Sequence, residues 1–274
     1  MTFIASTFDT TDELAFKACC AAAFQSPIVS YLLGRQWRPG GMALTEEMAS
    51  RACIDSESLV LDVACGLGDT AALLMERFGC SVVGLDFAAQ NLQLARGISP
   101  VITRSACTPS FVGGDAEQLP FAAARFEAAL CECALSTFPD KRSALREVAR
   151  VLRPGGRLAL SDVALEVGAV PDALSGAWAR VACLADALSS SEYQSLLQDT
   201  GFVVEAVEDR RAAAKAFLEE IDRRLLLGRI AQALGKFGLE GLDIRAARNL
   251  IREALKLVEA GQLSYAYYVA RTPG

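Results

Sequence analysis

Acidic side chains and glycines stand at the points where short apolar runs end. Leu59 to Val63 is such a run; it contains Asp62 and is followed at once by Gly66 and Gly68. Turn glycines let a backbone approach a ligand closely, and the helix that follows presents free N–H groups at its start. A buried strand, a glycine turn and a helix in this order predict the opening of a nucleotide-binding βαβ unit.

A second run, Ser81 to Leu85, ends in Asp86. The acid follows the glycines by about the 20 residues expected of a carboxylate that binds ribose hydroxyls. Three later runs also end in reactive or polar residues: Phe111 to Gly113 before Gly114-Asp115-Ala116-Glu117, Phe126 to Leu130 before Cys131-Glu132-Cys133, and Arg157 to Ser161 before Asp162. Parallel strands would bring all of these ends to one edge of a sheet.

Four of these segments resemble, in order, the motifs of class I S-adenosylmethionine-dependent methyltransferases. They are Asp62-Val63-Ala64-Cys65-Gly66-Leu67-Gly68, Asp86, Gly114-Asp115-Ala116, and Val151-Leu152-Arg153-Pro154-Gly155-Gly156-Arg157-Leu158, within residues 36 to 208. The resemblance implies an α/β fold with a doubly wound, mostly parallel, seven-stranded sheet. One departure is Ala64, which stands where the family has its first turn glycine. Because alanine favours an ordinary φ, we expect a slightly different turn there.

The resemblance also implies how the methyl donor, S-adenosylmethionine, is held. Asp86 is expected to accept the ribose hydroxyls, and Asp115 to receive the adenine amino group. Asp62 is expected to orient the loop or the donor's ammonium group; the alternative is that it only ties the turn together. The full set of expected cofactor-binding residues is Asp62, Ala64, Cys65, Gly66, Gly68, Asp86, Phe87, Asp115, Ala116 and Cys131.

The segment Cys131 to Ser136 is similar to the fourth-strand segment of arsenite methyltransferases, which hold a trivalent arsenical with cysteines. The similarity implies Cys133 and Cys183 as ligands of a thiophilic acceptor, and soft thiolates suit such an element. Alternation along the strand predicts that Cys131 and Cys133 point the same way, with Glu132 opposed to them. Glu132 is the expected general base. The alternative is that Cys133 and Cys183 are buried small hydrophobic residues.

Two other functions fit the same pattern. The first is carbon or oxygen methylation of a quinone-like or other apolar small molecule, with later helices as the pocket wall. The second is a regulatory protein that binds S-adenosylmethionine without transferring its methyl group. The chain contains no histidine, so no imidazole is available as a general base or metal ligand.

Composition narrows the partners. The net charge of −6 in 274 residues disfavours a nucleic-acid partner held through its phosphates. The first residues lack a basic region typical of a signal peptide, and no apolar run is long enough to span a bilayer. Nine cysteines without a Cys-x-x-Cys pair fit neither a zinc ribbon nor a disulfide scaffold. We therefore expect a cytoplasmic enzyme with free thiols, no metal and a small-molecule methyl acceptor; the oligomeric state is not predicted.

Three parts are expected along the chain. Residues 1–54 form an N-terminal helical lid segment, residues 55–209 and 262–274 the cofactor-binding core, and residues 210–261 a helical insertion between the last two strands. Thr45 is expected to cap a helix that ends near Cys53. Tyr31, Trp37 and Arg38 are candidate lid residues, although Trp37 could simply cover the sheet edge. The arginines of the insertion could hold an acidic partner or form a solvated face.

Overall fold

The computed structural model describes residues 31–32, 34, 38–102, 108–166, 184, 186–233 and 243–274, leaving aside the side chains of 98–102 and 231–233. The expectations for Trp37, Cys183 and the N-terminal helices before residue 31 lie outside the described residues.

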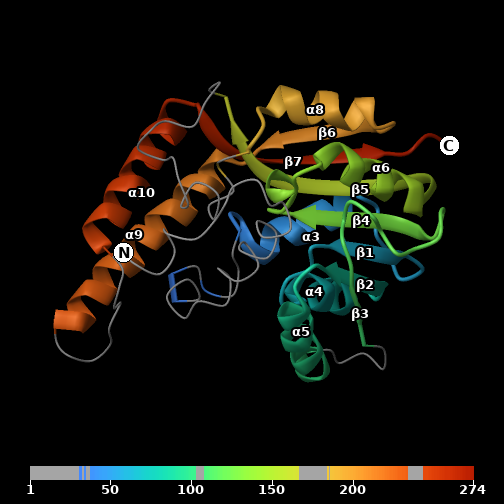
Figure 1. Cartoon of the computed structure of the whole chain (residues 1–274), viewed down its shortest axis with the longest axis horizontal. Coiled ribbons are helices and arrows are strands. Elements are labelled where there is room, and N and C mark those ends of the chain that lie inside the picture. Colours follow the sequence, from blue (N-terminus) through green and yellow to red (C-terminus); the bar gives the residue numbers. More distant parts are fainter. Residues whose placement is uncertain are drawn as a thin grey trace.

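Seven strands form one sheet in the order β3-β2-β1-β4-β5-β7-β6 (Figure 1). All neighbouring pairs are parallel except those that β7 makes with β5 and β6. The strands are β1 Leu59–Val63, β2 Ser81–Asp86, β3 Ser110–Gly113, β4 Phe126–Glu132, β5 Leu152–Leu165, β6 Val203–Asp209 and β7 Leu263–Arg271. The expected doubly wound, mostly parallel sheet is thereby confirmed.

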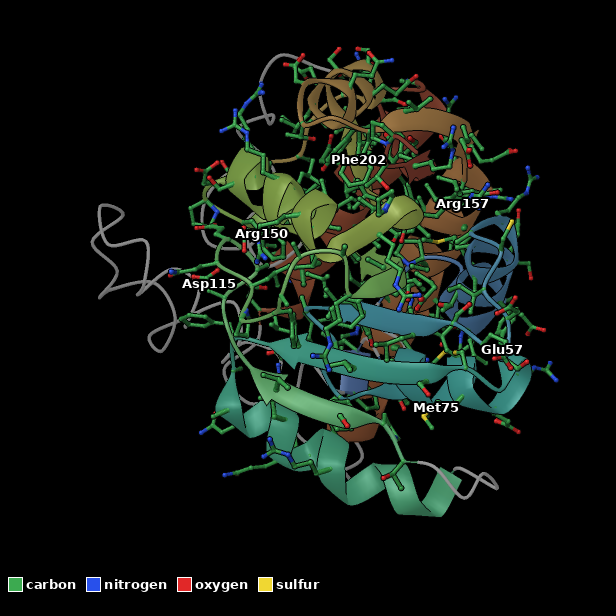
Figure 2. The ribbon with its side chains drawn as sticks, turned by 90° about the vertical axis from the view of Figure 1, so that its right-hand side faces the viewer. Glu57, Met75, Asp115, Arg150, Arg157 and Phe202 are labelled. Carbon is green, nitrogen blue, oxygen red and sulfur yellow. The ribbon has the colours of Figure 1, made fainter. Side chains whose placement is uncertain are left out.

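The parallel register brings the carboxyl ends of the inner strands to one edge. Asp62 of β1 pairs with Gly84 of β2 and with Leu130 of β4, so the ends of these three strands lie level. Glu57, which precedes β1, and Asp115, which follows β3, lie at opposite ends of the sheet (Figure 2). The polar residues after each strand therefore share the edge at which open α/β sheets bind ligands.

Helices cover both faces because side chains alternate along each strand. Val60 packs in a cluster with α3, α4 and α5, whereas Leu61 packs in a second cluster with α6 and α8. The helices are α3 Gly41–Arg51, α4 Asp69–Phe78, α5 Ala89–Ile102, the 3₁₀ turn η1 Leu135–Thr137, α6 Lys141–Val151, α8 Ser190–Asp199, α9 Arg211–Ala233 and α10 Ile244–Glu259.

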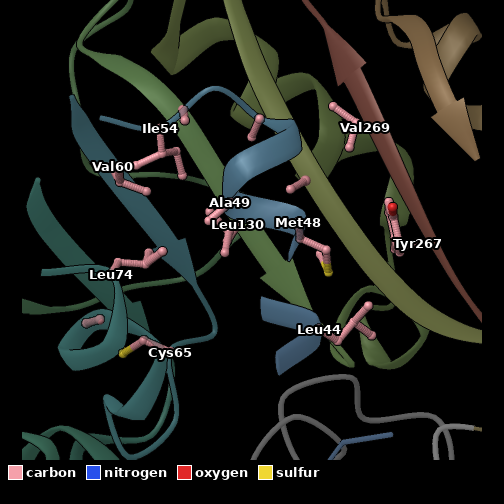
Figure 3. Close-up of a cluster of buried hydrophobic side chains, with 14 of the residues drawn as sticks. Leu44, Met48, Ala49, Ile54, Val60, Cys65, Leu74, Leu130, Tyr267 and Val269 are labelled. Carbon is pink, nitrogen blue, oxygen red and sulfur yellow. The ribbon is translucent and has the colours of Figure 1, made fainter. Parts of the chain in front are cut away.

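Helix α3 anchors the chain ahead of β1 to the sheet. Leu44, Met48 and Ala49 are buried in the same cluster as Leu130 of β4 and Val269 of β7 (Figure 3). Burying such side chains stabilises the docked helix by about 1.5–3 kcal/mol for each large one. This segment is consequently docked on one face of the sheet.

Helices α9 and α10 follow β6 and precede β7 in the sequence. They lie side by side and extend beyond the sheet (Figure 1). Asp243 caps α10 by accepting a hydrogen bond from the N–H of Ala246. Arg248 of α10 contacts Asp222 of α9 through two hydrogen bonds of 2.7 and 2.8 Å. The division of the chain into three parts stays a prediction. Among the described residues, no helix is both long and apolar enough to cross a membrane.

Replacing Gly84 with alanine should lower the free energy of unfolding. The added Cβ would lie 2.7 Å from the Phe111 ring and 2.9 Å from the Cys65 sulfur. Overpacking of this kind costs about 1–3 kcal/mol. Urea denaturation of Gly84→Ala and Gly113→Ala measures it, because a Cβ at Gly113 meets only Leu92 at an ordinary 3.6 Å. Equal stabilities of the two variants would contradict this packing.

Candidate active site

The loop between β1 and α4 is built from residues in the left-handed region. Ala64, Gly66 and Gly68 have φ values of +57°, +53° and +78°. The expectation of an ordinary φ at Ala64 is therefore wrong. A left-handed alanine costs only about 1–2 kcal/mol, so the tight turn keeps the glycine-like geometry despite the substitution. A Cβ on Gly68 would lie 2.7 Å from the Phe111 ring, which explains why this position has no side chain.

Asp86 closes this loop at the end of β2. Its carboxylate accepts hydrogen bonds from the N–H groups of Gly66 and Ala88, both at 2.8 Å, and from the Asn91 amide at 3.1 Å. Burial raises the pKa of Asp86, and these three donors partly offset the rise. Since a carboxylate has about four lone-pair sites, one stays available to a ligand hydroxyl.

Asp62 is buried at the end of β1, directly beneath the loop. Its Oδ2 atom has no hydrogen-bond partner among the described residues. Burial raises the pKa of Asp62 well above its usual value, and the negative charge of Glu132 raises it further, while Arg38 lowers it. A buried, unsatisfied carboxylate oxygen is costly unless a donor or cation binds it. Asp62 thus marks a place for a positively charged hydrogen-bond donor.

The other expected donor-site residues lie around the same edge. Ala116 is buried, and Asp115 accepts a hydrogen bond from the N–H of Glu117 at 3.0 Å in the turn after β3. Phe87, next to Asp86, keeps 41% of its surface exposed. These placements leave apolar surface and a carboxylate beside the loop, but their roles stay predictions.

Glu132, at the end of β4, is buried in a dense set of contacts. Its Oε2 lies 2.9 Å from Arg38 Nε, and it accepts a hydrogen bond from the Thr45 hydroxyl at 2.8 Å. Its Oε1 accepts one from the Thr70 hydroxyl at 2.8 Å. The side chains of Arg38 and Glu132 are 14% and 4% exposed. A carboxylate fixed in this way is suited to holding an arginine in place, so the general-base role expected for it stays a prediction.

Thr45 and Thr70 of this network were not recognised as site residues from the sequence, and Arg38 was expected only as a lid residue. Arg38 donates to the hydroxyls of Thr45 and Thr70, at 2.6 and 2.9 Å. The expectation that Thr45 caps α3 is wrong, because the helix begins at Gly41 and its N-cap is Gly40. Thr45 lies in the second turn with its hydroxyl turned to Glu132 instead. The signal that could have found the set is a buried acid that must be balanced by a cation.

The cysteines at the end of β4 do not share a face. Cys131 is buried in the cluster under α6 and α8, whereas Cys133 packs against the cluster on the opposite face. The predicted alternation fails because β4 ends at Glu132 and Cys133 has a φ of +53°. Burial raises the pKa values of the Cys65 and Cys131 thiols, so both are neutral. Among the described residues, no cluster of His, Cys, Asp or Glu could hold a metal.

Asp162, at the edge within β5, orders the turn that follows β4. It accepts hydrogen bonds from the N–H and hydroxyl of Ser136, at 2.7 and 2.8 Å, and from the N–H of Val163. Burial raises the pKa of Asp162 to about 6, and the hydrogen bonds from Ser136 limit the rise. The turn η1 is therefore fixed relative to the strand edge.

A pocket of about 500 Å³ lies between the start of α3 and helix α9. Its wall is mostly apolar or small, and Arg38, Glu220 and Arg224 are the polar side chains that line it. Arg224 donates to Glu220 at 2.6 Å, so these two charges are paired. Arg38 thus belongs both to the pocket and to the network at the strand edge. The remaining lining residues are Leu32, Gly34, Gly40, Gly41, Ala213, Ala216, Phe217 and Ile221.

Comparisons with known proteins define the class. Residues 61–160 match the family model described as a methyltransferase domain. An O-methyltransferase of Pyrenophora dematioidea is 33% identical over 61% of this chain, and the match spans 63% of its own length, under two thirds. An O-methyltransferase of Aspergillus nomiae, rstn1, is 30% identical over 61% of this chain and 74% of its own. A demethylmenaquinone methyltransferase of Deinococcus radiodurans is 39% identical over 49% of this chain and 52% of its own.

Solved structures show the same fold. The phosphoethanolamine N-methyltransferase 2 of Haemonchus contortus, solved with S-adenosylhomocysteine, has a TM-score of 0.78 at 17% identity and covers 98% of this chain and 61% of its own. The cyclopropane synthase MmaA2 of Mycobacterium tuberculosis has a TM-score of 0.74 at 13% identity, over 97% and 100% of the two chains.

The fold and the strand-edge motifs define a class I methyltransferase fold. The chain belongs to the S-adenosylmethionine-dependent methyltransferases, and S-adenosylmethionine is its cofactor. The residues present fit this group, because the orphaned Oδ2 of Asp62 calls for a cation and S-adenosylmethionine carries an ammonium group. The resemblance to arsenite methyltransferases finds no counterpart among these relatives.

Replacing Asp162 with asparagine should make the variant relatively more stable at high pH. The folded pKa of about 6 exceeds the unfolded value of 3.8, so the contribution of Asp162 is fully present below about pH 4 and is lost as pH rises through 6. The free energy of unfolding of the natural protein minus that of Asp162→Asn should fall by about 3 kcal/mol between about pH 4 and pH 7.5.

Urea denaturation at both pH values measures this difference, and Asp140→Asn is the control. Asp140 caps α6, and its hydrogen bonds from Ser143 lower its pKa. Its contribution is lost only as pH falls below the unfolded value of 3.8, so the difference for Asp140→Asn should stay nearly constant between about pH 4 and pH 7.5. A pH-independent difference for Asp162→Asn would refute the assignment.

Proposed function

We propose that the protein transfers a methyl group from S-adenosylmethionine to an oxygen or carbon atom of a small, largely apolar molecule. The observation that supports this best is the pocket of about 500 Å³, with an apolar side formed by Phe217 and Ile221, that shares Arg38 with the carboxyl edge of the sheet. S-adenosylmethionine supplies an electrophilic methyl group on a sulfonium sulfur, so the protein's task is positioning and exclusion of water.

The donor side of the proposal assigns each carboxylate a partner. Asp62 would bind the ammonium group through its orphaned Oδ2, and Asp86 would accept a ribose hydroxyl at its remaining lone pair. Asp115 and Ala116 would contact the adenine, with the exposed ring of Phe87 beside them. The backbone of the loop from Ala64 to Gly68 would hold the methionine end.

The acceptor side of the proposal is the pocket under α9. Phe217 and Ile221 supply apolar contact, and Ala213 and Ala216 leave room between them. Pockets of this size are typical of sites for small ligands. Relatives named as O-methyltransferases and a demethylmenaquinone methyltransferase support an oxygen or carbon acceptor, including a quinone-like ring.

A thiophilic acceptor such as arsenite has weaker support. Cys131 is buried on one face and its neutral thiol is a poor ligand, because metalloids bind thiolates. Cys133 lies on the other face, and Cys183 lies outside the described residues. The described cysteines therefore do not converge on one acceptor site.

Methyl transfer from radiolabelled S-adenosylmethionine tests the proposed function directly. The acceptor panel should contain menadiol, simple phenols, arsenite and dithiothreitol, with transfer expected to the quinol or a phenol. Donor binding without transfer to any of them would favour a non-catalytic binding protein. Arsenite-dependent transfer that is lost in Cys133→Ser would instead favour the thiophilic acceptor.

A tryptophan in place of Ala216 should fill the proposed acceptor pocket. We expect the KM for the acceptor to rise about tenfold or more, while the affinity for S-adenosylhomocysteine stays unchanged, because Ala216 lines the pocket away from the strand edge. Ala212→Trp is the matched control, since Ala212 is also exposed on α9 but does not line the pocket. An unchanged acceptor KM in Ala216→Trp would place the acceptor elsewhere.

A further inference from the structure

Arg38 makes polar contacts with three different elements at the strand edge. Its Nη2 donates to Thr45 and Thr70, and its Nε forms the ion pair with Glu132. Thr70 lies in the first turn of α4, two residues after Gly68 of the loop between β1 and α4. The Arg38 side chain therefore contacts α3, α4 and the end of β4.

Burial lowers the pKa of Arg38, but the charges of Glu132, Tyr265, Asp62 and Cys133 more than offset it and raise the pKa overall. The guanidinium is therefore a permanent cation in a place shielded from water. Charge interactions are strong in such surroundings, so a change in the charge on its neighbours is felt at Arg38.

Two residues that precede Arg38 in the sequence, Tyr31 and Leu32, contact α9. Arg224 donates to the backbone carbonyls of Tyr31 and Leu32, at 3.4 and 3.1 Å, and the Tyr31 hydroxyl donates to the Arg224 carbonyl at 3.3 Å. Leu32 packs with Ile221 of α9 in a buried cluster of its own. Tyr31 and Leu32 are thus fixed to α9, and Arg38 is fixed to the strand edge.

We propose that Arg38 is a positioning residue that couples occupancy of the donor site to the acceptor pocket under α9. The proposal rests on the proposed function, because it takes the strand edge as the donor site. Glu132 forms an ion pair with Arg38 at 2.9 Å, and the unsatisfied Oδ2 of Asp62 lies buried at the same edge of the sheet. An ammonium group that binds Asp62 adds a second cation. Among the carboxylates, Arg38 then interacts with Glu132 alone, which fixes its stem against the pocket.

This rearrangement supplies the differential contact that coupling between two sites needs. Nothing in it requires Arg38 to touch the reacting atoms. Donor binding makes the pocket wall better ordered, so an acceptor that arrives second meets a wall already in place.

Hydrogen exchange with S-adenosylhomocysteine as the probe tests the coupling without a known acceptor. In the full-length protein, saturating S-adenosylhomocysteine should slow exchange of the α9 amides over residues 213–224 by about fivefold or more. In the double variant Arg38→Met with Glu132→Gln, S-adenosylhomocysteine should still bind while the slowing is lost. The double change avoids leaving Glu132 as a buried, unpaired charge.

Two further variants complete the design. Arg51→Met, at the end of α3, removes an exposed arginine that pairs with Glu208, and it should respond to S-adenosylhomocysteine as the natural protein does. Arg38→Lys keeps the buried cation but loses the fork of donors, so it should bind S-adenosylhomocysteine and show a reduced slowing.

The outcomes separate the two claims. If S-adenosylhomocysteine fails to bind the natural protein, the proposed function fails. If it binds but exchange over residues 213–224 does not slow, the coupling is refuted while the proposed function stands. The coupling is also refuted if S-adenosylhomocysteine slows exchange equally in the natural protein and in either Arg38 variant.

Discussion

Four strands end in or carry a buried carboxylate at the same edge of the sheet: Asp62, Asp86, Glu132 and Asp162. Buried charges of one sign must each find donors or cations, or else bind protons. Backbone N–H groups satisfy Asp86, the Ser136 turn satisfies Asp162, and Arg38 balances Glu132. The arrangement of the loops and of α3 around this edge follows from that requirement.

Asp62 is the exception, and it gives the site its chemical character. Its neighbour Arg38 is occupied by Glu132 and two threonine hydroxyls, so one oxygen of Asp62 stays unsatisfied. Because this oxygen lacks a partner, the edge suits a ligand that carries an ammonium group and a sulfonium. The apolar pocket beyond Arg38 suits the opposite kind of ligand. In the proposed function, the donor site and the acceptor pocket therefore meet at one arginine, Arg38.

The sheet could be predicted because its signals are local: apolar runs, turn glycines and their order along the chain. The insertion helix α10 and its cap Asp243 could be predicted for the same reason. The details of the site that the sequence did not predict depend on long-range contacts or on single backbone dihedrals. Arg38 reaches Glu132 across 94 positions that no spacing rule links, Ala64 accepts a left-handed φ within a loop that needs it, and Cys133 leaves the strand's alternation by one backbone turn.

The central claim is that the orphaned oxygen of Asp62 binds the ammonium group of the methyl donor. Calorimetric titration of the natural protein and Asp62→Asn with S-adenosylhomocysteine and with methylthioadenosine, which lacks the amino-acid end, tests it most directly. We predict that Asp62→Asn loses about tenfold or more in affinity for S-adenosylhomocysteine, as expected for one charge-assisted hydrogen bond, and little for methylthioadenosine. Equal losses for the two ligands, or no loss for either, would contradict the account.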